Sequence, residues 1–176
     1  MNKLLKVAPI GTLCAVALVS VAVGADLAKD GSYDYTTCFT RNVTYLEYSS
    51  THSAWSYNER GTAVSSPQGG MFDGDEIQCV GMTASLDGKN YGNSACIGIA
   101  KDGATRLTRF WYNSDGKLQR ETVGGTGKYD GMVTTGTAQA VKEPQGIKPG
   151  TQTVEYCNRN VGTYKLNQHV QAEVRQ

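Results

Sequence analysis

Five Asp-Gly pairs recur at nearly regular intervals through the middle of the sequence, and they constrain the fold more than any other feature. They begin at residues 73, 87, 102, 115 and 130, so that successive pairs lie 13 to 15 residues apart. Asp-Gly between β-forming runs is a strong signal for a tight hairpin turn. The spacing therefore predicts a series of antiparallel strands. The segments between the turns share no residue pattern, so the interval is not a sequence repeat.

The β-rich runs around these turns predict an all-β protein. The predicted strands are 33–41, 44–49, 54–58, 76–86, 90–101, 105–113, 117–129 and 132–142, followed by part of 153–164. No helical period is visible after the first 25 residues. We therefore predict an antiparallel up-and-down barrel of about eight strands in preference to an α/β fold. Two Gly/Pro-rich connections, 65–70 and 143–150, are candidates to cover a barrel mouth.

The first residues have the pattern of a secretory signal peptide. Lys3 and Lys6 precede an apolar run over 7–23, and small residues at 24–25 suit cleavage after Ala25. An uncleaved membrane anchor is the main alternative. A lipoprotein signal is disfavoured because the cysteine in this run comes too early. We predict a protein exported to the periplasm or the cell exterior.

Cleavage divides the chain into a signal peptide at 1–25, a single barrel domain at 26–166 and a polar C-terminal tail at 167–176. The removed segment carries two lysines and no acid, which leaves 15 basic and 16 acidic residues and a net charge of −1. This balance gives no electrostatic reason to expect nucleic acid as a partner. No later apolar run is long enough to span a bilayer, so we expect no membrane association after cleavage.

The cysteines support export to an oxidising compartment. Cys14 is lost with the signal peptide, which leaves an even number of cysteines, as expected for a disulfide-bonded secreted protein. The remaining four are Cys38, Cys79, Cys96 and Cys157. A zinc site is disfavoured because no Cys-x-x-Cys spacing is present. We predict no metal and no cofactor.

Turn geometry selects one of the three possible disulfide pairings. A two-residue turn at 87–88 places Cys79 opposite Cys96 on the next strand. Counting outward from the turn makes these residues a non-hydrogen-bonded pair, whose close Cα atoms suit a disulfide. Cys38 then pairs with Cys157. This second bridge would join the first and last strands, as closure of a barrel requires.

The stretch Gln119–Thr137 is exceptionally rich in glycine among β-forming residues. Its glycines are Gly124, Gly125, Gly127, Gly131 and Gly136. Such glycines usually mark a bulge, a sharp bend or a close backbone approach. A phosphate-binding P-loop is excluded because Thr122 and Tyr129 occupy the places of its first Gly and its Ser or Thr. A dinucleotide fingerprint is excluded by the wrong glycine spacing and by a following strand instead of a helix.

The same stretch resembles the signature of the allene oxide cyclase and dirigent-like superfamily, particularly its small secreted bacterial members. The resemblance lies in Gly124 to Gly127 followed by Tyr129 and Gly131. Weaker similarity extends to the Cys79 to Cys96 hairpin, Lys101-Asp102-Gly103, and Cys157 leading to Gly162-Thr163-Tyr164-Lys165-Leu166. The resemblance implies a short antiparallel barrel, typically of eight strands, with a central apolar cavity. It carries over no catalytic residue, because the matching motif is a structural turn.

Motifs for catalysis or metal binding are sparse. A Ser-His-acid triad would need His52 or His169, but no nucleophile elbow accompanies either of them. Asp73, Asp75 and Glu76 do not fit the spacing of a calcium loop. We interpret that acidic cluster as a solvated turn.

The barrel interior is the remaining candidate site. If Tyr45 and Glu47 share an inward face, and Arg109 and Trp111 do likewise, a Glu47–Arg109 pair would orient a polar group of a bound apolar ligand. In the alternative, both charges lie on the outer surface. Alternation along a strand does not reveal which face is inward, and a one-residue bulge reverses it.

These observations predict an exported small β-barrel protein that binds a small apolar or amphipathic ligand. The alternatives are an isomerase or cyclase of a small apolar substrate, which depends mainly on the family resemblance, and a surface protein-interaction module. An ionisable residue inside an apolar cavity would favour the enzyme. A filled barrel with an exposed apolar patch would favour interaction.

Overall fold

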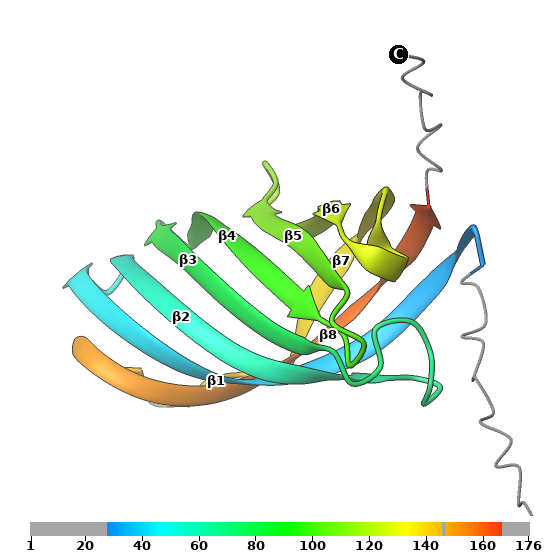
Figure 1. The fold of residues 1–176 in the computed structure, drawn as a ribbon. Helices are drawn as coiled ribbons and strands as arrows, with labels where there is room; N and C mark the ends of the chain where they lie inside the picture. The colour runs from blue at the N-terminus through cyan, green and yellow to red at the C-terminus, as the bar shows by residue number, and fades with distance from the viewer. Residues whose placement is uncertain (1–27, 146, 167–176) are drawn as a thin grey trace, which may run out of the picture.

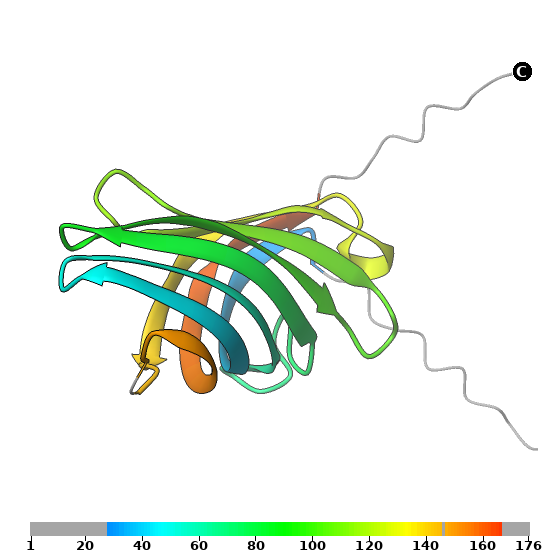
Figure 2. The same cartoon turned by 90° about the vertical axis from the view of Figure 1, so that its left-hand side faces the viewer.

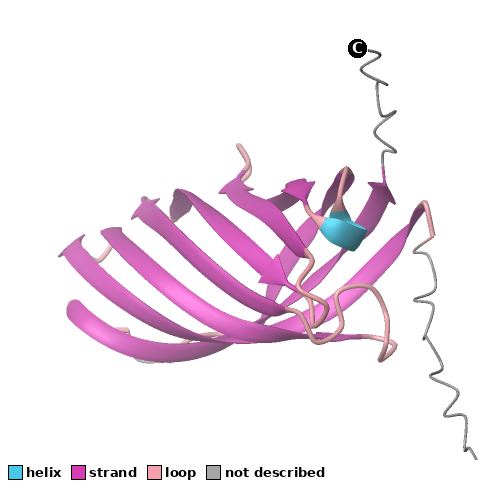
Figure 3. Cartoon of the chain, in the orientation of Figure 1, coloured by secondary structure: helices cyan, strands magenta, loops and turns pink. Residues whose placement is uncertain are grey.

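The computed structural model describes residues 28–145 and 147–166, which form a closed barrel of antiparallel strands (Figure 1). Each strand pairs with its neighbours in sequence, and the first pairs with the last. The strands are β1 (Asp30–Ser49), β2 (His52–Ser65), β3 (Glu76–Leu86), β4 (Lys89–Ile99), β5 (Thr105–Tyr112), β6 (Leu118–Gly125), β7 (Met132–Lys142) and β8 (Gly150–Leu166). One 3-10 turn, η1 (Gly127–Tyr129), is the sole helical element in this part of the chain (Figure 3). The predicted eight-stranded antiparallel barrel is confirmed.

Two predictions lie outside the described residues, namely the signal peptide at 1–25 and the polar tail at 167–176. Within the described ranges, no helix has the length and apolar character needed to cross a membrane.

Most predicted strands match the observed ones, and the differences occur where polar residues were taken as strand ends. The predictions 76–86 and 132–142 coincide with β3 and β7. The separate segments 33–41 and 44–49 are one strand, because β1 continues through Asn42, whose outward side chain accepts a hydrogen bond from Thr153 at 2.8 Å. The predicted strand 117–129 ends at Gly125, and η1, from Gly127, forms part of the turn to β7.

The Asp-Gly pairs form turns as predicted. The glycine of each of the five pairs has a positive φ, between +65° and +84°, which an L side chain rarely adopts. At 87–88 Asp87 also has a positive φ, +50°, as a two-residue type I′ hairpin requires. The flanking Leu86 and Lys89 are directly opposite each other, and this register places Cys79 opposite Cys96.

Both predicted disulfides are present, and they lie on opposite faces of the barrel wall. Cys79–Cys96 joins β3 and β4 on the inner face, where both residues are buried. Cys38–Cys157 joins β1 and β8 on the outer face, because the neighbouring Phe39 points inward. The Cα atoms are 4.1 Å and 4.0 Å apart, as expected for directly opposite residues.

The glycine-rich stretch forms a bulge followed by a tight turn. Val123 is the extra residue between the pairs that β6 makes with β5, which locally bends the strand. A Cβ on Gly125 would lie 2.2 Å from the carbonyl oxygen of Tyr129, and Gly127 and Gly131 have positive φ angles. Gly124 has open space around it. Glycine is therefore required at positions 125, 127 and 131 for reasons of backbone geometry.

One end of the barrel is closed by the loop 66–75, which connects β2 to β3. Phe72 of this loop is buried, and its ring lies 5.4 to 5.7 Å from the rings of Tyr33, Tyr35 and Tyr129. The opposite end carries the β1–β2 and β3–β4 turns and the described parts of the connection between β7 and β8, 143–145 and 147–149. The strands curve around the interior between these ends, as the view in Figure 2 shows. The closed end thus forms a floor for the space above it.

Candidate functional site

The interior of the barrel holds a cavity with a volume of about 410 Å³. All eight strands contribute lining residues, because every second side chain of a strand points inward. The wall combines aromatic rings with hydroxyl and amide groups. The aromatic lining residues are Tyr35, Phe39, Trp55, Tyr57, Phe110, Tyr112 and Tyr156. Glu143, Pro144 and Ile147 of the loop 143–149 also line the cavity, so this predicted mouth-covering segment does reach it.

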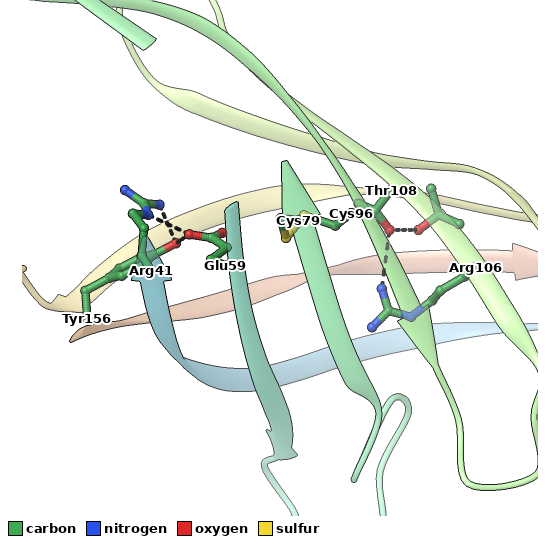
Figure 4. Close-up of a disulfide and its surroundings, with 8 residues drawn as sticks. Arg41, Glu59, Cys79, Cys96, Arg106, Thr108 and Tyr156 are labelled. Atoms are coloured by element: carbon green, nitrogen blue, oxygen red, sulfur yellow. Dashed lines mark hydrogen bonds and ion pairs between the residues drawn. A yellow bond between two sulfur atoms is a disulfide. The ribbon is translucent and has the colours of Figure 1, made fainter. Parts of the chain in front are cut away.

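Three polar side chains meet on one wall, at strands β1, β2 and β8 (Figure 4). Arg41 Nε donates to Glu59 Oε2 at 2.6 Å, and Tyr156 Oη donates to the same oxygen at 2.7 Å. Arg41 Nη2 donates to Tyr156 Oη at 2.5 Å. Glu59 is 5% exposed, so its charge depends on these partners for compensation. We call Arg41, Glu59 and Tyr156 the wall cluster.

The wall cluster fixes two aromatic rings that line the cavity. The Arg41 guanidinium carbon lies 4.0 Å from the centre of the Tyr57 ring and 4.1 Å from that of Tyr156. The ring of Phe39 also stacks on that of Tyr156, with the ring centres 5.3 Å apart. Burial, with the charge of Glu59 adding to it, raises the pKa of Tyr156, and burial likewise raises the pKa of Tyr57. Both phenols therefore stay protonated at neutral pH.

A second polar network closes the floor. Arg106 Nε donates to Asp75 Oδ2 at 3.1 Å, and its Nη1 donates to Thr108, which in turn contacts Thr122 at 3.0 Å (Figure 4). The Tyr129 hydroxyl donates to Asp75 at 3.0 Å. Burial raises the pKa of Asp75, while the nearby Arg106 opposes that shift. Burial also raises the pKa of Tyr129, and the charge of Asp75 contributes to that increase.

The residues predicted from sequence lie elsewhere. Arg109 and Trp111 do share a face, with the guanidinium 4.9 Å from the indole ring, but this is the outer face of β5. Arg109 is paired with Glu121 at 2.7 Å instead of Glu47, so the predicted Glu47–Arg109 pair does not form. Glu47 is exposed at the end of β1, and Tyr45 is half-buried. The outer-surface alternative therefore describes Arg109, whereas Glu47 is exposed at the end of the barrel.

Sequence reasoning missed the residues of the wall cluster. Arg41 was placed at the end of a predicted strand, and Glu59 directly follows the predicted strand 54–58. The available signal was the spacing of Tyr57 and Glu59, because residues two apart in a strand lie on the same face of the sheet. The family resemblance implied an apolar cavity, whereas the observed lining is mixed. The cavity is lined by the charged Arg41, Glu59 and Arg106 as well as by aromatic rings.

The arrangement suits binding of a small molecule with both apolar and polar parts. The rings offer flat apolar surfaces, and the hydroxyl and amide groups among them offer directional hydrogen bonds. Among the described residues, no three His, Cys, Asp or Glu side chains gather as metal ligands would. Comparison with protein-family models, curated proteins and solved structures finds no match for this chain.

Proposed function

We propose that this protein is an exported β-barrel that binds a small amphipathic molecule inside the barrel. The observation that carries the proposal is the interior cavity of about 410 Å³. Its volume lies within the range of about 300 to 1,000 Å³ typical of small-molecule sites, which are mostly apolar with a few placed polar groups.

The wall cluster supports this proposal because it holds the binding surface in place before a ligand arrives. Tyr57 and Tyr156 are each stacked on Arg41, and Tyr156 is also hydrogen-bonded to Glu59. Side chains that are already ordered lose little conformational entropy on binding, so a larger part of the contact energy appears as affinity. The apolar part of the ligand would lie against these rings and against Trp55.

Export is supported by the predicted signal peptide and by the two disulfides, which are typical of proteins from oxidising compartments. Membership of the allene oxide cyclase and dirigent-like superfamily is also a proposal. It depends on the glycine motif, and the eight-stranded antiparallel barrel expected from that resemblance is the fold observed.

Native mass spectrometry of the exported protein, together with titration of the uncharged fluorescent probe phenylnaphthylamine, tests the function. Ala138 lines the cavity, whereas Gln139 next to it is exposed on the outer face of β7. Ala138→Phe should fill part of the cavity and abolish ligand retention and probe fluorescence. Gln139→Phe adds the same ring outside the barrel and should leave both unchanged.

Two results would contradict the proposal. The first is a wild-type protein that carries no small molecule and gives no probe signal. The second is an Ala138→Phe variant that binds the probe as tightly as the wild type. The second result would place any binding outside the cavity.

An isomerase or cyclase is the second candidate, favoured by the presence of Glu59 and Tyr156 inside the cavity. Ionisable groups in a desolvated site are a common feature of catalytic centres. The candidates differ in what happens to the retained molecule. Prolonged incubation that converts it to an isomer, with conversion lost in Glu59→Gln, would favour the enzyme.

A protein-interaction role has one supporting observation, namely apolar side chains exposed on the outer face of β3, β4 and β5. These are Val80, Met82, Ile97 and Leu107. Self-association or capture of a partner that is lost on changing Val80 and Met82 to Thr would favour this role over ligand binding.

A further inference from the structure

The interior of the barrel contains more positive than negative charge. Three arginines are enclosed by the described strands against two carboxylates. Arg41 is paired with Glu59, and Arg106 is paired with Asp75. Arg120 is the third arginine. Glu143 also lines the cavity, but it is an exposed residue of the loop after β7. Among the buried side chains of the described barrel, one positive charge therefore has no compensating carboxylate.

Arg120 is fully enclosed by aromatic rings. It is 1% exposed, and none of its three guanidinium nitrogens has a hydrogen-bond partner in the described part of the chain. Its guanidinium carbon lies 4.6 Å from the ring of Tyr33, 5.5 Å from that of Tyr35 and 5.8 Å from that of Phe110. Burial raises the pKa of Tyr33 although Arg120 opposes this, so the phenol is neutral and does not balance the charge.

The floor of the cavity also presents polar atoms without partners. Arg106 Nη2, Thr37 Oγ1 and Asn160 Oδ1 are buried and lack hydrogen bonds within the described residues, and all three side chains line the cavity. Tyr35 and Phe110, which contact Arg120, line it too. Arg120 is thus separated from the cavity by these rings. Buried polar groups are almost always satisfied in folded proteins, so several orphans around one cavity need an explanation.

We propose that the ligand of this cavity is a small organic anion, such as a carboxylate, and that its charged group binds at the floor against Arg106 and Thr37, with Arg120 supplying the balancing charge. The inference rests on the proposed function and specifies the chemistry of the ligand. An anion there would accept hydrogen bonds from Arg106 Nη2 and the Thr37 hydroxyl, both of which are free to donate. Hydrogen bonds between charged groups are about twice as strong as neutral ones, and the desolvated interior strengthens the attraction to Arg120.

A matched pair of probes tests the charge. Anilinonaphthalene sulfonate is the anionic derivative of phenylnaphthylamine, so the two probes share their rings and differ in one negative group. The wild-type protein should bind the anion at least about tenfold more tightly than the uncharged parent. Arg120→Met removes the excess charge and should abolish this preference. Arg109→Met, on the outer face, changes the net charge of the protein equally and should keep the preference.

Thermal melts of the unliganded variants guard against a trivial loss of folding. Arg120 makes no hydrogen bond and Met can still pack against the surrounding rings, so Arg120→Met should leave the melting temperature unchanged or higher. Thr37→Val preserves the shape of the side chain and removes a hydroxyl that makes no hydrogen bond. This variant should also fold, and it should weaken binding of the anionic probe but not of the uncharged one.

The outcomes separate this inference from the proposed function. Equal affinity of the wild-type protein for both probes would overturn the anion inference and leave cavity binding intact. A preference for the anion that survives in both Arg120→Met and Thr37→Val would overturn it as well. Binding of neither probe would contradict the proposed function and this inference together.

Discussion

Replacement of Gly125 by alanine should destabilise the barrel far more than the same replacement at the adjacent Gly124. A Cβ on Gly125 would lie 2.2 Å from the carbonyl oxygen of Tyr129, whereas ordinary van der Waals contact begins at 3.4 Å. The η1 turn must therefore move by about 1 Å, and overpacking of this kind costs about 1 to 3 kcal/mol. A Cβ on Gly124 would meet no atom within 4 Å.

Displacement of Tyr129 adds to the loss of stability. Tyr129 donates from its hydroxyl to the buried Asp75 at 3.0 Å, and a hydrogen bond to a charged group contributes about 1.5 to 3 kcal/mol. If the shift weakens that bond as well, the free energy of unfolding falls by about 3 kcal/mol. For a barrel of about 140 residues the entropy of unfolding is about 0.3 kcal/mol per degree, so the melting temperature should fall by about 10 °C.

Thermal melts followed by circular dichroism provide the measurement, with Gly124→Ala and Lys128→Ala as controls. Both controls should lie within about 0.5 kcal/mol of wild type, because Lys128 is a surface residue whose contacts are an exposed ion pair with Asp102 at 3.1 Å and the edge of the turn at the Tyr129 ring, 5.2 Å away. Equal melting temperatures for Gly125→Ala and Gly124→Ala would refute the steric reasoning. A nucleotide that raises the melting temperature of the wild type but not of Lys128→Ala would show that the glycine turn binds phosphate.

Three further predictions concern the disulfides, the buried tyrosines and export. Replacing both cysteines of the β1–β8 bridge by alanine should lower the free energy of unfolding by about 5 kcal/mol, from the chain entropy of a loop of 119 residues; urea denaturation showing a loss below about 1 kcal/mol would contradict this. Burial raises the pKa of Tyr156. The contribution of its protonated phenol to the free energy of unfolding is therefore fully present below the ordinary tyrosine pKa of about 10. That contribution is lost at higher pH, because the unfolded chain releases a proton that the folded chain retains. The urea midpoint should therefore fall between about pH 9 and about pH 11, and less steeply in Tyr156→Phe; identical slopes would count against a buried, protonated phenol. The exported protein should begin at Asp26 and gain four hydrogens on reduction of its two disulfides, and an intact mass without that shift would contradict the predicted pairing.

The sequence alone determined the local features of the barrel. The Asp-Gly pairs predict the turns because only residues that tolerate a positive φ suit them, and the two-residue turn at 87–88 fixes the β3–β4 register and hence the Cys79–Cys96 bridge. The glycines at 125, 127 and 131 likewise indicate a tight turn. Each of these features depends on residues that are close in sequence or joined by one short turn.

Only the tertiary structure decided which face of each strand is inward, and therefore where the site lies. In β5 the charged Arg106 is buried whereas the apolar Leu107 is exposed, which is the reverse of what polarity along the strand indicates. Burial of Arg106 is possible because Asp75, 31 residues away in sequence, lies beside it in the closed barrel. The wall cluster likewise depends on residues far apart in sequence, because Tyr156 is hydrogen-bonded to Glu59, 97 residues away. Compensation of a buried charge depends on partners brought together by barrel closure, and alternation within a single strand does not identify those partners.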